Sequence, residues 1–255
     1  RYTYLYFEYL VPCALSTPGY AEPLLEELER LYDEAISKIE DPNRNAVKQP
    51  HQLWPSTTLY YRIANDYTPA ETENVHEALR FFNEHTCITF VPYEESRDAG
   101  ERYIYYKTSE KMCGTRVGYN RQSRGPHDVV LAPSCAAIQG VVQHETLHVL
   151  GLYHEQSRPD RNNYVMIDFS NIPLQYWPQF AAVSETQATT YDVPYDYESI
   201  MHYSKNAFAR NPGKPTILAK EGDTVVEREM GQVVAPSQAD LMKIRLMYKC
   251  DEGRF

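Results

Sequence analysis

The sequence predicts an α+β fold in two lobes that meet near residue 150. Strand and helix patterns follow one another before that point, whereas the chain beyond it is rich in turns until a final helix. The 255 residues are enough for a sizeable shared core. No segment approaches the roughly 18 consecutive apolar residues of a membrane-spanning helix, so we expect no membrane span.

The composition and charge exclude two classes of protein. Hydrophobic residues make up 42% and charged residues 24% of the chain, which is typical of a folded rather than a disordered protein. The net charge of −10 argues against nucleic acid as a partner, because DNA and RNA are also negatively charged. Residues 1–44 hold 4 basic and 9 acidic side chains, half of the excess negative charge, so we expect a separable segment there.

The start of the chain has the features of a leader followed by a boundary. Because the chain begins with Arg1 rather than Met, we expect it to be a fragment of a longer precursor. Residues 4–15 are apolar like the core of a signal peptide, although a glutamate and a proline interrupt them. Leucines at helical spacing predict an amphipathic helix over residues 22–40, and the Pro- and Asn-rich residues 42–55 mark the boundary.

Strands and a helix are expected next. Residues 58–63 predict a strand, and Thr68 caps a helix in which Pro69 lies in the first turn and Glu71 completes a capping box. This helix is expected to run to about Glu84 and to bury one apolar face, formed by Val75, Ala78, Leu79 and Phe82. Further short strands are predicted over residues 87–91, 102–107 and 128–132. The final helix opens at Ser237, with Asp240 in a second capping box, and ends near Tyr248.

A helix over residues 138–152 carries the most informative motif, HETLHVLGLYHE. His144 and His148 are four residues apart, so their imidazoles project from one face of the helix, one turn apart. That is the geometry that two ligands of one zinc ion need. Glu145 follows the first of them and can reach a metal-bound water without binding the metal, as a general base must.

The end of this motif supplies a third ligand. Gly151 can take the left-handed conformation that ends a helix, and the turn would bring His154 back toward the other two histidines. Three neutral imidazoles leave one coordination position open, which is typical of a catalytic zinc. The alternative is a helix with ordinary buried or surface histidines. The full HExxHxxGxxH pattern favours zinc hydrolysis.

The extended motif resembles that of the metzincin metallopeptidases, and HETLHVLGLYHEQSRPDR over residues 144–161 closely resembles the astacin family. The sequence SIMHY at 199–203 resembles the Met-turn of that family. The similarity covers about residues 44–250. It implies a two-lobed, zincin-like catalytic domain with a twisted mixed sheet, an active-site helix and an irregular C-terminal lobe. The upper lobe would span about 45–152, the lower lobe 153–250, and a tail 251–255.

The resemblance also implies a role for each matching residue of the site. His144, His148 and His154 would bind one Zn²⁺ ion per chain, and Glu145 would be the general base. Met201 would form a hydrophobic floor beneath the metal, which differs little from an ordinary core methionine. Tyr203 would be an extra zinc ligand at rest that swings away to donate a hydrogen bond to the developing oxyanion.

Activation is implied by the same resemblance. An activating protease would cut after Arg44, and Glu155 would then meet the new amino group of Asn45. The alternative for Glu155 is a solvent-facing carboxylate at the end of a helix. Residues 1–44 occupy the place of a pro-segment but lack the F-x-G-D motif that blocks the metal in many relatives. Glu8, Glu22 or Cys13 would have to serve instead, or none of them.

The five cysteines point to an oxidising compartment. None forms a C-x-x-C pair, and four lie beyond residue 80, which indicates two disulfides and a leftover thiol. The alternative is five buried thiols in a cytosolic protein. The resemblance implies the pairs Cys87–Cys250 and Cys113–Cys135. Cys13 is then either a thiolate that reaches the zinc or a leader thiol without such a role.

The resulting prediction is a secreted zinc endopeptidase that acts on proteins or peptides. The substrate would bind in extended form along a strand edge near residues 128–132. Several family members hold an acidic substrate residue with a basic side chain after a Gly-Gln pair, but Val233 follows Gly231-Gln232 here, so we expect a weaker acidic preference. Two alternatives are a latent zymogen blocked by residues 1–44 and a non-catalytic, zinc-stabilised binding module.

Overall fold

A computed structural model describes residues 46–251 of the chain. The predicted leader or pro-segment lies outside the described residues, and so do its helix at 22–40, Cys13, Arg44, Asn45 and most of the predicted tail. The predicted α+β class is confirmed by a mixed five-stranded sheet, a second sheet of three strands and several helices. None of the helices in the described part is long and apolar enough to cross a membrane.

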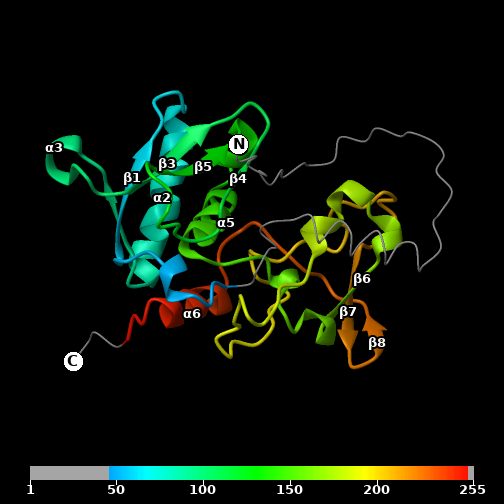
Figure 1. Cartoon of the computed structure of the whole chain (residues 1–255). Helices are drawn as coiled ribbons and strands as arrows, with labels where there is room; N and C mark the ends of the chain where they lie inside the picture. The colour runs from blue at the N-terminus through cyan, green and yellow to red at the C-terminus, as the bar shows by residue number, and fades with distance from the viewer. Residues whose placement is uncertain (1–45, 252–255) are drawn as a thin grey trace.

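The larger sheet has the strand order β2-β1-β3-β5-β4, and it lies with its helices at the left of Figure 1. Its strands are β1 (Thr58–Ile63), β2 (Thr89–Pro92), β3 (Tyr103–Thr108), β4 (Gly114–Thr115) and β5 (His127–Leu131). Neighbouring strands are parallel except for β4, which pairs antiparallel with β5. Four of the five strands start within two residues of the predicted positions. Along β1 and β3 the second and fourth side chains are buried, whereas β5 is buried at four of its five positions.

Two long helices cover the buried face of this sheet. The helix α2 (Pro69–His85) begins with the predicted capping box and buries the four predicted apolar residues. Its neighbour α5 (Gln139–Leu150) is buried along nearly its whole length and packs against α2, β4 and β5. Short helices and 3-10 turns connect the other elements: η1 (Pro50–Gln52), α3 (Glu95–Asp98), α4 (Pro133–Ala136), η2 (Glu155–Ser157), η3 (Arg161–Asn163), η4 (Phe169–Asn171) and η5 (Leu174–Phe180).

The chain beyond α5 is not as irregular as the sequence suggested. It forms an antiparallel sheet of β6 (Val165–Ile167), β7 (Ile217–Glu221) and β8 (Thr224–Val226), at the lower right of Figure 1. The prediction missed this sheet because β6 has only 3 residues and pairs with a strand about 50 residues further along. The hairpin between β7 and β8 did carry a signal in the sequence, because its two-residue turn is Gly222-Asp223 and glycine is typical of such turns. Gly222 takes φ 60° there.

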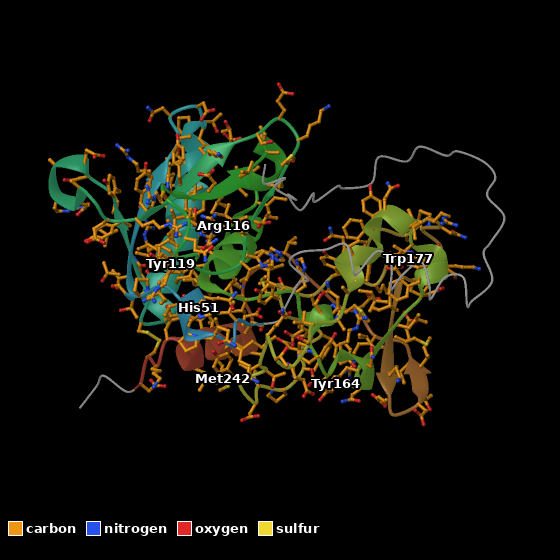
Figure 2. All side chains as sticks on the ribbon, in the orientation of Figure 1. His51, Arg116, Tyr119, Tyr164, Trp177 and Met242 are labelled. Carbon is orange, nitrogen blue, oxygen red and sulfur yellow. A yellow bond between two sulfur atoms is a disulfide. The ribbon has the colours of Figure 1, made fainter. Side chains whose placement is uncertain are left out.

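The buried apolar residues form two clusters. One lies between the larger sheet, α2 and α5, and the other surrounds Trp177 and Phe180 behind the smaller sheet. Figure 2 shows Tyr119 on the side of the larger sheet and Trp177 on the other side. The last helix, α6 (Gln238–Met247), has the predicted capping box but packs into the first cluster rather than the second. The division into lobes at residue 152 stays a prediction.

Two disulfides tie distant parts of the chain together. Cys87 is joined to Cys250 across 163 residues of sequence, which links the end of α6 to the larger sheet. Cys113 is joined to Cys135 across 22 residues, beside β4. These are the pairs that the resemblance implied. Closing loops of this size stabilises the folded state by roughly 3–5 kcal/mol each in the loop-entropy model.

Candidate active site

The helix α5 carries two buried histidines. His144 and His148 lie one turn apart with ring centroids separated by 4.7 Å. Gly151 ends the helix with φ 110°, and its amide donates to the carbonyl of His148. A side chain at Gly151 would also be crowded, because a Cβ there would lie 2.9 Å from Val47 and 3.0 Å from Met247. Glycine is therefore required by both conformation and space.

The turn at Gly151 returns the chain to the histidine pair. His154 lies with its ring centroid 4.8 Å from that of His148 and 5.4 Å from that of His144. One ring nitrogen from each of the three histidines lies within 4.8 Å of the others, and all three side chains are buried. The structure thus brings together the three residues predicted to bind metal.

Hydrogen bonds set the tautomers of the two helical histidines. His144 Nδ1 lies 2.7 Å from the carbonyl oxygen of Ile200, and His148 Nδ1 lies 2.7 Å from that of Leu152. A carbonyl oxygen only accepts, so each Nδ1 carries the proton and each Nε2 keeps its lone pair. Backbone carbonyls thus orient both rings as such contacts orient metal-binding histidines.

Burial keeps the three imidazoles neutral. It lowers the pKa of His144 to about 3 and that of His148 to about 4, and it lowers the pKa of His154 well below the usual range. Neutral imidazole is the form that binds zinc. Burial acts in the opposite direction on the neighbouring carboxyl and raises the pKa of Glu145 to about 8.

A divalent cation fits this set of groups. Glu145 Oε2 is buried and has no hydrogen-bond partner among the described residues. An unpaired carboxylate oxygen in an apolar site is costly unless a cation or a proton donor is near. Three imidazole nitrogens beside it match a tetrahedral zinc site that keeps one position for water or substrate.

The Met-turn at residues 199–203 forms the far wall of the site. Met201 is fully buried, and its carbonyl accepts a hydrogen bond of 2.9 Å from the amide of Glu155. Tyr203 packs its ring 4.5 Å from that of His154, and its hydroxyl donates to Gln179 Oε1 at 3.4 Å. Burial raises the pKa of Tyr203, so its hydroxyl stays protonated at neutral pH.

Glu155 lies inside the protein, so the solvent-facing alternative for this side chain is wrong. Its Oε1 accepts from Arg158 Nη1 and from the amide of Asp196, each at 3.0 Å. Its Oε2 accepts from Lys243 Nζ. The predicted contact with the amino group of Asn45 lies outside the described residues and stays a prediction.

The sequence did not indicate three residues that support the site. Asp240 caps α6 as predicted, but it also accepts from Ser199 Oγ at 2.6 Å and from the Ile200 amide at 3.1 Å, which fixes the Met-turn. Gln156 accepts from the Tyr203 amide at 3.0 Å. Lys243 was not predicted to have a role at all. A capping box signals only the local contact of Asp240, and nothing local signals the other two.

The expected strand edge for the substrate was placed on the wrong strand. Two residues of β5, Val129 and Val130, pair with β4, so the segment 128–132 lies inside the sheet. The outer strand on this side is β4 itself. Cys113 directly precedes it, and the disulfide to Cys135 holds it against the end of β5.

The segment predicted to influence specificity lies against both α5 and the Met-turn. Gly231 takes φ 70°, and a Cβ there would lie 2.4 Å from the carbonyl oxygen of His202. A Cβ at Gly140, in the first turn of α5, would lie 1.9 Å from the carbonyl oxygen of Val233. The Val233 side chain itself is half exposed.

Comparisons with known proteins agree with this geometry. The model of the peptidase family described as Astacin matches residues 46–249. Tolloid-like protein 2 of Homo sapiens is 32% identical over 207 residues, which are 81% of this chain and 20% of that protein. Zinc metalloproteinase nas-14 of Caenorhabditis elegans is 34% identical over 232 residues, which are 91% of this chain and 43% of that protein.

A solved structure shares the fold. High choriolytic enzyme 1 of Oryzias latipes, a hatching enzyme zinc-protease, superposes with a TM-score of 0.70 at 29% identity, over 81% of this chain and 100% of that chain. The two curated relatives are longer, and this chain spans 20% of one and 43% of the other.

Proposed function

Because this chain belongs to the astacin family of peptidases, we propose that it is a secreted, zinc-dependent endopeptidase that hydrolyses peptide bonds in proteins. The observation that carries this proposal is the buried set of three neutral imidazoles next to a carboxyl oxygen of Glu145 without a hydrogen-bond partner in the described part of the chain. Secretion is supported by the two disulfides, which are typical of oxidising compartments.

His144, His148 and His154 would hold one zinc ion per chain. A zinc ion at this position supplies a Lewis acid that polarises a peptide carbonyl and lowers the pKa of a water molecule toward neutrality. Glu145 follows His144 on the buried face of α5 and is the only carboxylate of the HETLH segment. It would take the proton from the attacking water and return it to the leaving amine.

Tyr203 would stabilise the negative charge that develops on the carbonyl oxygen. Its protonated hydroxyl donates to the neutral side chain of Gln179 at 3.4 Å, a long hydrogen bond that a stronger acceptor can replace. A single such donor contributes roughly 3 kcal/mol to transition-state stabilisation in other hydrolases. Met201 would act only through packing, as the buried floor of the site.

The substrate would lie extended along β4, which is the outer strand of the larger sheet next to α5. Strand addition supplies backbone hydrogen bonds that do not depend on the substrate sequence. An endopeptidase that cleaves within folded or extended proteins needs such sequence-tolerant binding. Side-chain pockets beside the scissile bond would then decide which peptides are cut.

Cleavage after Arg44 is expected to switch the enzyme on. The full chain should hydrolyse casein at least tenfold faster after cleavage by a trypsin-like protease, because residues 1–44 would no longer occupy the cleft. The Arg44→Gln variant is the control, since it cannot be cut at this position and should stay at the uncleaved rate. Equal rates before and after cleavage would exclude a latent zymogen. A cleaved, zinc-loaded chain without activity would favour the non-catalytic binding module.

Cleavage specificity is expected to show a weak preference for acidic residues just past the scissile bond, because Val233 supplies no positive charge. Installing a charge with Val233→Lys should raise the relative cleavage of peptides with Asp or Glu at that position by roughly 1.4-fold to fivefold, as expected for a partly exposed ion pair. Val234→Lys is the matched control, since that side chain is 81% exposed. A peptide-library profile of the unaltered enzyme dominated by Asp or Glu would contradict the expectation.

A further inference from the structure

The last helix reaches the site through two buried charged side chains. Asp240 and Lys243 lie three residues apart on α6, so they project from the same face, and both are fully buried. Asp240 holds the Met-turn through Ser199 and Ile200. Lys243 contacts the carboxylate of Glu155, in the 3-10 turn that follows the third histidine. One helix therefore contacts both segments that form this wall of the site.

Lys243 and Arg158 are not equivalent partners of Glu155. Arg158 divides its guanidinium among several acceptors: Glu155 at 3.0 Å, the carbonyl of Val193 at 3.0 Å, and both carboxylate oxygens of Asp160 at 2.9 Å. Lys243 donates to Glu155 Oε2, and both side chains of this pair are 0% exposed. The second carboxylate oxygen of Glu155 thus receives its cation from α6.

Glu155 is coupled by its backbone to the metal-binding residues. It follows His154 directly, and its amide donates to the carbonyl of Met201. A carboxylate held at both oxygens cannot rotate, so the 3-10 turn that begins at Glu155 is fixed relative to the Met-turn. An apolar side chain at 243 would avoid the desolvation cost of a buried ammonium, but it would offer no directional bond to Oε2.

We propose that Lys243 is a positioning residue for the third zinc-binding histidine: its ammonium, carried on α6, holds the Glu155 carboxylate and thereby fixes the turn that presents His154. The proposal deepens the proposed function, since it concerns the affinity of the same zinc site. The cations of Arg158 and Lys243 that meet Glu155 are side chains of the chain itself. The turn is therefore fixed before any cleavage after Arg44.

The test uses the full, uncleaved chain and zinc alone. Lys243→Met is expected to weaken zinc binding at least tenfold, measured by competition with a chelating dye, and to lower the unfolding midpoint by roughly 6–20 °C. Loss of residues that orient metal ligands typically costs 10- to 100-fold in metal affinity. Arg245→Met is the matched control on the same helix, because that side chain is exposed and donates to the His85 carbonyl, away from the site. It should leave zinc affinity within twofold.

A second control separates positioning from general stability. Leu79→Ala removes a buried side chain of α2 in the first cluster and should lower the unfolding midpoint by a similar amount. Its zinc affinity should stay within twofold of the original chain. If Lys243→Met and Leu79→Ala lower the midpoint equally and neither changes zinc affinity, Lys243 is merely structural and the proposal is overturned.

A double variant keeps the proposal testable if Lys243→Met does not fold. Lys243→Met combined with Glu155→Gln buries no unpaired charge at this contact. The zinc affinity of the double variant should equal that of Glu155→Gln alone, because the two substitutions remove the same interaction. Losses that add would overturn the proposal. Zinc affinity is measured without any peptide, so this test does not depend on catalysis. A chain whose zinc affinity depends on Lys243 but that cleaves no peptide would refute the proposed function and leave this inference intact.

Discussion

Replacing Glu145 with alanine is expected to reduce kcat for a peptide substrate by roughly 10³- to 10⁴-fold, at the upper end of the range for general acid–base catalysis. Glu145 is the residue proposed to carry the proton from water to the leaving amine. Its Oε2 has no hydrogen-bond partner in the described part of the chain, so no neighbouring group is positioned there to take over this role. The measurement is hydrolysis of a fluorogenic peptide by the cleaved enzyme at saturating substrate. The zinc content of the variant should stay unchanged, because Glu145 is not one of the three clustered ligands.

The control for Glu145→Ala is a variant that removes a carboxylate far from the three histidines in the sequence. Glu84→Ala removes an exposed carboxylate from α2 and should leave kcat within twofold. Glu145→Gln keeps the shape of the side chain but cannot accept the proton, so it should be as impaired as alanine. A Glu145→Ala variant that retains zinc and more than a tenth of the original kcat would remove Glu145 from the mechanism.

Replacing His154 with alanine is expected to abolish stoichiometric zinc binding and to reduce activity by at least roughly 10³-fold. Only His144 and His148 would remain as ligands, and losing a direct ligand should cost more than the 10- to 100-fold that loss of an orienting partner costs. Without the ion, nothing lowers the pKa of the attacking water toward neutrality, so water at neutral pH is a much weaker nucleophile. Elemental analysis and peptide hydrolysis measure the two effects separately.

The controls for His154→Ala are a second histidine variant and the removal and re-addition of zinc. His76→Ala removes a partly buried histidine of α2 that bonds the Tyr61 hydroxyl, outside the metal cluster, and should keep zinc and activity. The original chain should lose activity in a strong chelator and regain it on addition of zinc, whereas His154→Ala should not respond. Full zinc occupancy in His154→Ala would mean that this histidine is not a ligand.

Much of the site could be predicted from the sequence because its determinants are local. The spacing of His144 and His148 fixes their shared helix face, and Gly151 permits the turn to His154 at φ 110°. The capping boxes at Thr68 and Ser237 fixed two helix starts for the same reason. Each of these features depends on side chains no more than about six residues apart.

The strand predictions for the larger sheet also succeeded, but the smaller sheet was missed. Alternating burial along β1 and β3, and the mostly buried run of β5, are properties of each strand by itself. In contrast, β6 and β8 have 3 residues each, and they become strands only by pairing with β7. The choice of β5 as the substrate edge failed for a related reason, since strand order in a sheet is not a local property.

The sequence by itself therefore determined the three histidines that cluster, Glu145 beside them and the helix that carries two of these histidines, because a helix turn and a glycine bend place these groups within a few residues of one another. Only the tertiary structure decided what supports them. Asp240 and Lys243 act on residues 41 and 88 positions away, and both contacts exist because α6 packs into the cluster of α5 rather than against the smaller sheet. Buried charges need partners, and the partner of a buried charge is set by which elements pack together, which no local pattern records.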